Sequence, residues 1–402
     1  MQEFETQLKH KLTILALGAE SSGNFSICKN GKIYFSEDFS DLQEVTNFQG
    51  YKRELNKYLK EHEIEPDVIL SDLHPLFLTT QLAKDLAKKY KARHILVQHH
   101  IAHIFSTVGE NTLETESCEL EADFFGIACD GTGYAEDETI WGGEVFKIYN
   151  LQLPISNKIK NSKLQIKRMG HLEHQFLIGG ELAIKEPARV LISILSKFLS
   201  KENTYHHLKK HYKKNEFELL WNQLQQNFNC LETSSTARIL DAVSVLLGFS
   251  KNEMLSKHGP VKLLEQNSTN TYTNLKPTIE FDKEQRMLIL KTTPLFKYLI
   301  KNINKDKKRL AATAQKYIAD GLLEICHQSS VISHQNSNIE NRLSLLTHNR
   351  LPVFFSGGMA NNKIISQLLE KEGVYINRKI PRGDAGISFG QIFFFLLANP
   401  RD

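Results

Sequence analysis

The stretch LTILALGAESSGNFSICKNGKIYF, residues 12–35, sets how the chain begins to fold. Leu12–Leu17 is apolar and rich in residues that favour strands, and Phe25–Cys28 and Lys32–Phe35 follow it. Asn30-Gly31 lies between the last two runs, and this dipeptide between apolar segments is the strongest short-range signal for a β-hairpin. We therefore predict that the chain opens with antiparallel strands.

Apolar periodicity then alternates between helix and strand as one moves along the chain. The segments are a helix at Tyr51–His62, a strand at Asp67–Ser71, a helix at Thr79–Lys91 and a strand at His94–Gln98. The predicted order is β-β-β-α-β-α-β, which is an α/β lobe.

A second cycle starts after the acidic stretch Glu110–Glu121, which we interpret as a surface connection. Its predicted strands and helices are Phe124–Cys129, two antiparallel strands Glu138–Phe146 and Lys147–Leu151 around Gly142-Gly143, and strands Leu351–Phe355 and Val374–Ile376 alternating with helices Asn361–Lys371 and Ile387–Ala398. We predict an N-terminal α/β lobe at residues 1–120 and a C-terminal α/β lobe at residues 121–402.

Residues about 170–345 have a mainly helical pattern and form a predicted insertion in the second lobe. Apolar residues recur at helical spacing in Leu182–Leu199, Glu216–Asn227, Thr236–Leu247 and Leu310–Cys326. Residues 328–349 are polar enough to predict a mobile loop.

Composition excludes several classes of protein. Hydrophobic residues make up 41% and charged residues 24% of the 402 residues, which is typical of a globular chain. The formal charge of +4 gives no reason to expect nucleic acid or an anionic membrane as a partner. Five cysteines without a CxxC pair argue against a zinc ribbon or a disulfide framework. The chain has neither a signal peptide nor an apolar run of about 18 residues, so we expect a cytoplasmic protein.

Two glycine-rich turns follow predicted strands. Asp130-Gly131-Thr132-Gly133 follows the first, and Ser356-Gly357-Gly358 follows the second and precedes a helix near Asn361-Asn362. Glycines let backbone N–H groups approach a phosphate, and a helix N-terminus favours an anion. Each turn alone could be a tight turn, but together they favour a bound nucleotide.

A pair of histidines suggests a metal ion. In Gln98-His99-His100-Ile101-Ala102-His103, His99 and His103 share one face if a helix starts at once after the strand. His207 and His211 have the same spacing in a lysine-rich segment, so spacing alone is weak evidence. Asp130 and Asp384 are candidate carboxylate ligands, and such a set suits iron, zinc or manganese. Asp384 could equally be a helix N-cap.

No nucleophile is recognisable from the spacing of residues. Ser356 and the pair Ser234-Ser235 have no convincing His/Asp partner in the sequence. The pattern therefore favours direct transfer of a group by positioning.

The chain resembles the C-terminal transferase module of the hydrogenase-maturation carbamoyltransferases (HypF type), which is Kae/TsaD-like and has a two-lobed actin/sugar-kinase-like (duplicated ribonuclease H-like) fold. The matching segments are LALGAE (15–20), SDLHPLFLTTQLA (71–83), QHHIAH (98–103), DGTGYAEDETIWGGEVF (130–146), MGHLEHQFLIGGELAIKEPAR (169–189), TSSTARILDAVSVLLGF (233–249), FSGGMANN (355–362) and PRGDAGISFGQ (381–391).

The resemblance implies a divalent metal, iron or zinc, held by His99, His103, Asp130 and Asp384. It implies nucleotide contacts from Gly131, Gly133, Gly357, Gly358 and Asn362. It further implies that a carbamoyl-adenylate made from ATP binds at this metal. The carbamoyl group then passes to an acceptor, in the HypF branch the C-terminal cysteine of a HypE-like partner protein, on the way to [NiFe] hydrogenase.

The sequence also departs from the family pattern. The resemblance covers the transferase module without the family's acylphosphatase, zinc-finger and YrdC-like domains, so we expect a separate YrdC-like domain to make the adenylate. The pattern GAELK reads GAESS at residues 18–22, SSMGR ends in Thr236-Ala237-Arg238, EGQ reads His258-Gly259-Pro260, and GGD reads Gly179-Gly180-Glu181.

Three functions are therefore compatible with the sequence. The first is a stand-alone carbamoyltransferase. The second is a regulatory protein that binds metal and nucleotide and, with Ser21, Ala237 and Pro260 in the pocket, no longer transfers. The third is an O-carbamoyltransferase for small molecules.

Overall fold

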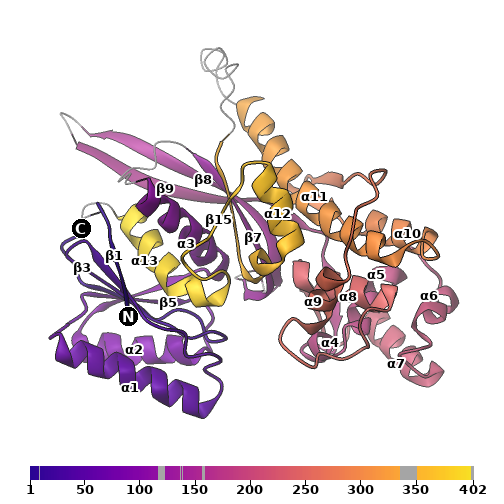
Figure 1. Cartoon of the computed structure of the whole chain (residues 1–402), viewed down its shortest axis with the longest axis horizontal. Coiled ribbons are helices and arrows are strands. Elements are labelled where there is room, and N and C mark those ends of the chain that lie inside the picture. Colours follow the sequence, from indigo (N-terminus) through magenta and orange to yellow (C-terminus); the bar gives the residue numbers. More distant parts are fainter. Residues whose placement is uncertain are drawn as a thin grey trace.

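Two β-sheets, each covered by helices, build the chain in the computed structural model (Figure 1). The structure describes residues 1–8, 10–115, 123–135, 137, 139–155, 159–335 and 351–399. Among these residues no helix combines the length and the apolar character that are needed to cross a bilayer.

The first sheet has the strand order β1-β4-β3-β2-β5-β6. Its strands are β1 (Gln2–Glu5), β2 (Ile14–Ala16), β3 (Ser26–Lys29), β4 (Lys32–Phe35), β5 (Val68–Asp72) and β6 (Arg93–Val97). The predicted hairpin is confirmed: Asn30 and Gly31 both have positive φ, 54° and 77°, and join the antiparallel pair β3/β4. On the other side of β2, strands β5 and β6 add in parallel.

The second sheet repeats this arrangement in its order β9-β8-β7-β14-β15. Its strands are β7 (Phe124–Tyr134), β8 (Ile140–Ile155), β9 (Ile159–Leu172), β14 (Val353–Ser356) and β15 (Tyr375–Ile376), extended by β12 (Thr278–Asp282) and β13 (Met287–Lys291). Strand β11 (Cys230–Thr233) pairs with β8, and β10 (Gln175–Ile178) pairs with β11. Three antiparallel strands followed by two parallel ones thus occur twice, which confirms the duplicated actin-like fold class.

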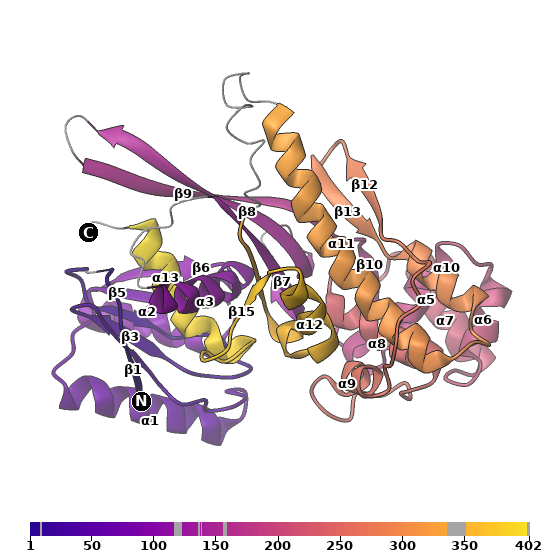
Figure 2. The same ribbon diagram turned by 45° about the horizontal axis from the view of Figure 1, so that its top comes forward.

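The helices fall into three groups (Figures 1 and 2). Helices α1 (Val45–Glu61) and α2 (Leu78–Tyr90) cover the outer face of the first sheet. Helices α3 (His99–Glu114) and α13 (Ile387–Ala398) lie between the two sheets. The others belong to the second lobe: α4 (Leu182–Lys185), α5 (Ala188–Ser196), α6 (Lys201–Leu208), α7 (Lys214–Gln225), α8 (Thr236–Leu247), α9 (Gly259–Gln266), α10 (Thr293–Lys301), α11 (Lys307–Gln335) and α12 (Lys363–Lys371).

Helices α3 and α13 cross very closely. A Cβ atom at Gly390 of α13 would lie 1.8 Å from the carbonyl oxygen of Ala102 in α3, so only glycine permits this crossing. The C-terminal helix therefore packs on a helix from the first part of the chain. The division into residues 1–120 and 121–402 stays a prediction, and α13 packs across it.

Three predicted elements were wrong in detail. Residues 140–151 do not form two strands, since they belong to the single strand β8, which runs through Gly142 and Gly143; residue 138 lies outside the described residues. A Cβ atom on Gly143 would lie 2.6 Å from the carbonyl oxygen of Ser234, so these glycines allow a close approach rather than a turn. The helix predicted at Leu182–Leu199 is split into α4 and α5 around Pro187. The mainly helical insertion also contains strands β10 to β13, which we did not predict.

For residues 110–114 of the acidic stretch Glu110–Glu121, the interpretation as a surface connection was also wrong, whereas residues 116–121 lie outside the described residues. Helix α3 continues to Glu114, and Glu110 is only 5% exposed. Helix α11 extends to Gln335, past the start of the predicted loop, whereas residues 336–349 of that loop lie outside the described residues.

Candidate metal centre

Helix α3 begins directly after strand β6, and this places two histidines on one helical face. The side-chain oxygen of Gln98 accepts hydrogen bonds from the backbone N–H groups of His100 and Ile101, which caps the helix at its first turn. His99 and His103 therefore lie one turn apart, and both are buried.

Two aspartates reach the same point from the second lobe and from the C-terminal segment. Asp130 lies in β7, where the pairing with β8 shifts register between Cys129 and Gly133. Asp384 opens the short helix η3 (Asp384–Gly386) before α13. One ligand atom from each of His99, His103, Asp130 and Asp384 lies within 4.8 Å of all the others.

The separations of these atoms fit one first-row metal ion. The Nε2 atoms of His99 and His103 are 3.2 Å apart, and Asp130 Oδ2 is 3.2 Å and 3.4 Å from them. Asp384 Oδ1 is 3.6 Å from His99 Nε2 and 3.5 Å from His103 Nε2. Bonds of about 2.0–2.1 Å to a shared ion place neighbouring ligand atoms about 3.0–3.4 Å apart. The atoms of the two histidines and of Asp130 lie within this range, and Asp384 Oδ1 lies slightly beyond it.

The electrostatics of this cluster also suit a cation. Burial favours a neutral carboxyl group, but hydrogen bonds from the two imidazoles hold the pKa of Asp130 well below its usual range. Burial and the charge of Asp130 likewise disfavour ionised Asp384, yet the same two imidazoles keep its pKa low. Both carboxylates are thus ionised at neutral pH, and in a protein with a bound ion that ion would take the place of the imidazole protons.

Asp72 supports this cluster, although it is not among the predicted site residues. Its Oδ2 accepts a hydrogen bond from His99 Nδ1 at 2.7 Å, and Asp72 is 1% exposed. This bond leaves Nε2 of His99 as the ligand atom. Burial alone would lower the pKa of His99, but the Asp72 charge helps to raise it well above its usual value. The order of the segments could have indicated this contact. Asp72 ends β5 and His99 follows β6, and the ends of two neighbouring parallel strands lie side by side.

The first glycine-rich segment differs from the predicted turn. Strand β7 continues through Gly131 and Gly133 to Tyr134. A Cβ atom at Gly133 would lie 2.0 Å from the ring of His100, so this glycine makes room for an imidazole. A Cβ atom at Gly131 would meet only the guanidinium of Arg238, at 3.4 Å.

The second glycine-rich segment does follow a strand and lies beside the four-residue cluster. Gly357 has a positive φ of 97°, and a Cβ atom at Gly358 would lie 2.7 Å from Asp130 Oδ1. Asn362 caps α12: its Oδ1 accepts from the N–H groups of Ile364 and Ile365, and its amide donates to Gln315 at 2.7 Å. The side chain of Asn362 is thus largely occupied within the protein.

The departures from the family pattern have structural counterparts. The Ser21 hydroxyl donates a hydrogen bond to Asp384 Oδ2. Lys257, from the second lobe, donates from Nζ to the carbonyl oxygen of Ser21 at 3.1 Å. An ammonium group therefore lies next to Ser21, in the pair Ser21-Ser22 that stands where the pattern GAELK has leucine and lysine. Ala237 is buried in α8, and Pro260 lies in the first turn of α9, where a missing N–H costs no helical bond.

Other candidate groups and roles are not supported by the described residues. His207 and His211 do not belong to any potential metal-binding group among the described residues. Cys129 directly precedes Asp130, but burial raises the pKa of its thiol to about 12, so it is no thiolate at neutral pH. Asp384 does not cap α13, since no side chain caps that helix.

Comparison with known proteins covers nearly the whole chain. Residues 9–110 match the family described as "HypF Kae1-like domain", and residues 126–391 match "Carbamoyltransferase, Kae1-like Domain, second subdomain". The probable carbamoyltransferase HypF of Methanocaldococcus jannaschii is 33% identical over 409 residues, which cover 98% of this chain and 48% of the relative. Carbamoyltransferase HypF of Synechocystis sp. is 27% identical over 322 residues, covering 75% of this chain and 38% of that protein.

Two solved HypF structures also align with nearly the whole chain. Full-length HypF in its phosphate- and nucleotide-bound form aligns with a TM-score of 0.79 and 25% identity, over 98% of this chain and 47% of that one. HypF of T. kodakarensis aligns with a TM-score of 0.77 and 28% identity, over 98% and 48% of the two chains. The chain spans about half the length of the curated relative that it matches along nearly its whole length. It therefore belongs to the HypF carbamoyltransferase family, within which it corresponds to the C-terminal Kae1-like module.

Proposed function

We propose that the chain is a carbamoyltransferase module that binds a carbamoyl-adenylate at a divalent metal, iron or zinc, and passes the carbamoyl group to an acceptor. The observation that carries this proposal is the convergence of His99, His103, Asp130 and Asp384 on one point between the lobes, in a chain of the HypF family. A solved relative with phosphate and nucleotide bound supports the nucleotide part.

Different residues of the site would bind the metal ion and the nucleotide. The two imidazoles and two carboxylates would hold the ion, which when bound supplies a positive charge for phosphate or carbonyl oxygens. Gly131, Gly133, Gly357, Gly358 and the remaining amide hydrogen of Asn362 are the proposed nucleotide contacts. Of these, Gly358 packs directly against Asp130 and would present its backbone to a ligand at the ion.

No side chain of this site is proposed as a nucleophile. The thiol of Cys129 is held neutral by burial, and the Ser21 hydroxyl is bonded to Asp384. Transfer would then be direct: an acceptor thiolate attacks the carbamoyl carbon, a C–S bond forms, the C–O bond to the phosphate breaks, and AMP leaves. The proposed acceptor is the C-terminal cysteine of a HypE-like protein, and a YrdC-like domain would supply the adenylate.

The test is transfer by the purified chain. It is mixed with a YrdC-like enzyme, ATP, carbamoyl phosphate and a peptide that ends in cysteine, and the peptide mass is followed. We expect a gain of one carbamoyl group, lost in His99→Ala and kept in the matched variant His207→Ala. Metal binding without any transfer would instead favour the regulatory alternative.

A further inference from the structure

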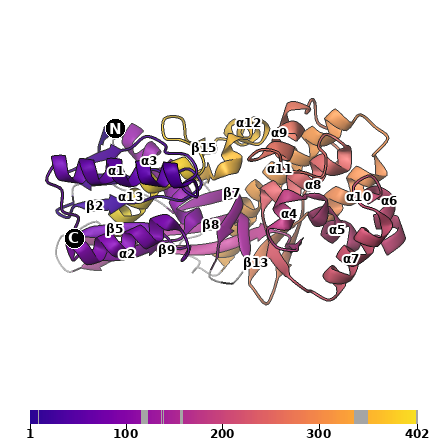
Figure 3. The same cartoon turned by 90° about the horizontal axis from the view of Figure 1, so that it is seen from below.

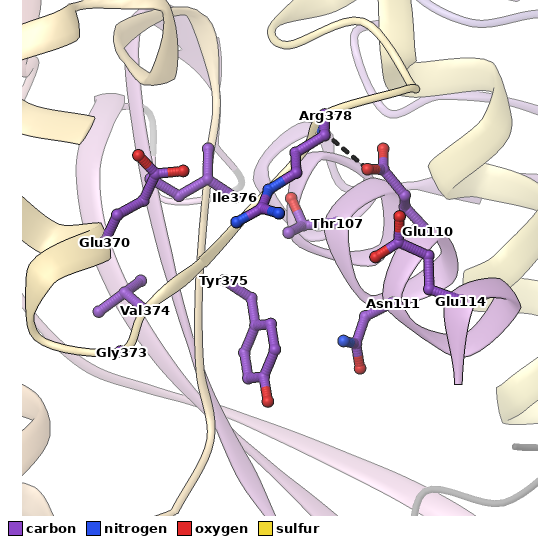
Figure 4. A pocket seen from close by; sticks show the side chains of 10 residues that line it. All are labelled: Thr107, Glu110, Asn111, Glu114, Glu370, Gly373, Val374, Tyr375, Ile376 and Arg378. Carbon is purple, nitrogen blue, oxygen red and sulfur yellow. Dashed lines mark hydrogen bonds between the residues drawn. The ribbon is translucent and has the colours of Figure 1, made fainter. Parts of the chain in front are cut away.

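The carboxylate of Glu110 lies on the same helix as the two histidines, two turns after His103. Its Oε1 accepts hydrogen bonds from the backbone N–H groups of Arg378 at 2.7 Å and Lys379 at 3.0 Å. Its Oε2 accepts from the N–H of Ile380 at 2.7 Å (Figure 4 shows Glu110 facing Arg378). One buried side chain thus satisfies three successive backbone donors of the segment 377–380.

Further hydrogen bonds and an ion pair connect residues 377–380 to helix α3. Asn377 donates to Glu110 Oε2 at 3.2 Å and to the carbonyl oxygen of Ser106 at 3.1 Å, and its own oxygen accepts from the Thr107 hydroxyl at 2.6 Å. Lys379 also pairs with Glu114 at 3.3 Å. Four of the contacting residues, Thr107, Glu110, Glu114 and Arg378, also line a cavity of about 350 Å³ at the far end of α3 from the histidines.

Residues 377–380 lie just before Asp384, one of the four candidate metal ligands. Only Pro381, Arg382 and Gly383 separate Ile380 from Asp384. Arg382 is itself fixed, since it donates to the carbonyl oxygen of Asn377 at 2.8 Å and to that of Ala360 at 2.9 Å. The backbone between the Glu110 contacts and Asp384 therefore has little conformational freedom.

We propose that Glu110 is a positioning residue of the metal centre: it fixes residues 377–380 on α3 and thereby sets where Asp384 stands relative to His99 and His103. Helix α3 then places three of the four ligands, two directly and one through Glu110. This inference rests on the proposed metal site of the preceding subsection, and it concerns how that site is built rather than what it transfers.

The physical reason lies in the carboxylate itself. Two oxygens with about four lone-pair sites can accept from three N–H groups and an amide at once. Glutamine offers one oxygen and turns an NH₂ group toward N–H donors, so at least one buried donor loses its partner. Relaxation of the segment would then move Asp384.

The test compares the Zn²⁺ affinity of the apo chain with that of E110Q, measured by chelator competition. The matched control is E173Q, because Glu173 likewise accepts from two backbone N–H groups, those of Thr292 and Thr293, but lies outside the four-residue cluster. We expect E110Q to bind Zn²⁺ about 10–100-fold more weakly and E173Q to bind within about twofold of the unchanged chain.

Hydrogen exchange supplies a second readout. Amides 378–380 should lose protection in E110Q, whereas H99A should lose Zn²⁺ with these amides still protected. If E110Q does not fold, Thr107→Val removes one bond of the same segment and should weaken Zn²⁺ binding by a smaller factor.

The outcomes separate the two proposals. Equal affinity in E110Q and the unchanged chain, or equal losses in E110Q and E173Q, would overturn the role of Glu110 alone. Failure of the unchanged chain to bind Zn²⁺ would overturn the metal site and with it this inference.

Discussion

At the scale of single residues, the cluster depends on how its ligands are held as much as on the ligands. His99 has one ring nitrogen bonded to Asp72 and the other directed toward the remaining ligand atoms. His103 differs, since its Nδ1 has no hydrogen-bond partner among the residues that the structure describes. The orientation of His99 is therefore set from outside the cluster, and that of His103 by packing in α3.

Asp72→Asn should weaken Zn²⁺ binding by about 10–100-fold, because a neutral amide orients His99 less firmly and makes its Nε2 less basic. Titration of the apo protein with Zn²⁺ measures this change. Asp85→Asn, at an exposed position of α2, is the control and should change nothing. Equal affinities in D72N and D85N would contradict the supporting role of Asp72.

Lys257→Gln should weaken binding of AMP to the Zn²⁺-loaded protein by about 3–10-fold, because it removes the ammonium group next to Ser21. The effect should shrink at high salt, since Lys257 is exposed. Calorimetry measures the affinity, with Lys251→Gln, another exposed lysine, as the control. Adding Ser22→Lys to K257Q should restore part of the loss, and an unchanged affinity in K257Q would remove Lys257 from the site.

At the scale of elements, the junction between the sheets depends on helix pairs that only particular residues allow. Apolar residues of α3, α13 and both sheets form one continuous cluster there. The view from below shows α3 and α13 between the strands of the two lobes (Figure 3). The histidines at the start of α3 and Asp384 just before α13 are placed by this pair of helices.

Gly390→Ala should lower the free energy of unfolding by about 1–3 kcal/mol, because its Cβ would clash with the carbonyl oxygen of Ala102 and force the helices apart. Gly50→Ala is the opposite case. Gly50 lies within α1, where a Cβ atom would meet only Phe39 at 3.9 Å, and alanine should add about 0.5–1 kcal/mol. Urea unfolding distinguishes them, and a G390A protein as stable as the unchanged chain would contradict the close crossing.

Glu173 gives a prediction for acid pH. Burial favours its neutral form, but Lys197, the Thr293 N–H and Lys291 lower its pKa from 4.5 to about 2. Since the folded state holds this proton less tightly, Glu173 stabilises the fold above about pH 4.5, by roughly 3 kcal/mol, and this contribution is lost as the pH falls toward 2. The difference in unfolding free energy between the unchanged chain and E173Q should therefore fall to about half between pH 7 and pH 3. A constant difference would contradict the assignment.

At the scale of the whole molecule, the four ligand candidates come from parts of the chain that meet only in the folded state. Two lie on α3, one lies in strand β7 of the second sheet, and one lies between strand β15 and helix α13. An ion bound by all four would therefore bind the folded state only, and its binding energy would add to stability.

Zn²⁺ at about 100 times its dissociation constant should raise the free energy of unfolding by about 2.7 kcal/mol. Thermal and urea unfolding with and without the ion measure the gain. His207→Ala should keep this gain and His99→Ala should lose it. The same gain in both variants would show that Zn²⁺ binds elsewhere.

Much of the architecture could be predicted from local patterns. The hairpin at Asn30-Gly31, strands β5 and β6, and helices α8 and α13 lie where apolar periodicity and turn residues indicated, because both are properties of neighbouring residues. The turn predicted at Gly142-Gly143 was wrong, because these glycines lie within a strand and allow a close approach of the distant residues Ser234 and Ser235.

Sequence by itself determined the order of strands and helices in the first lobe and proposed the four ligand candidates, because periodicity, turn chemistry and family motifs are carried by short segments. Tertiary structure alone decided that Asp72 orients His99, that Lys257 reaches Ser21 and that Glu110 is buried. These contacts join residues 27, 236 and 268 positions apart, and their existence depends on sheet register and helix crossing rather than on any local pattern.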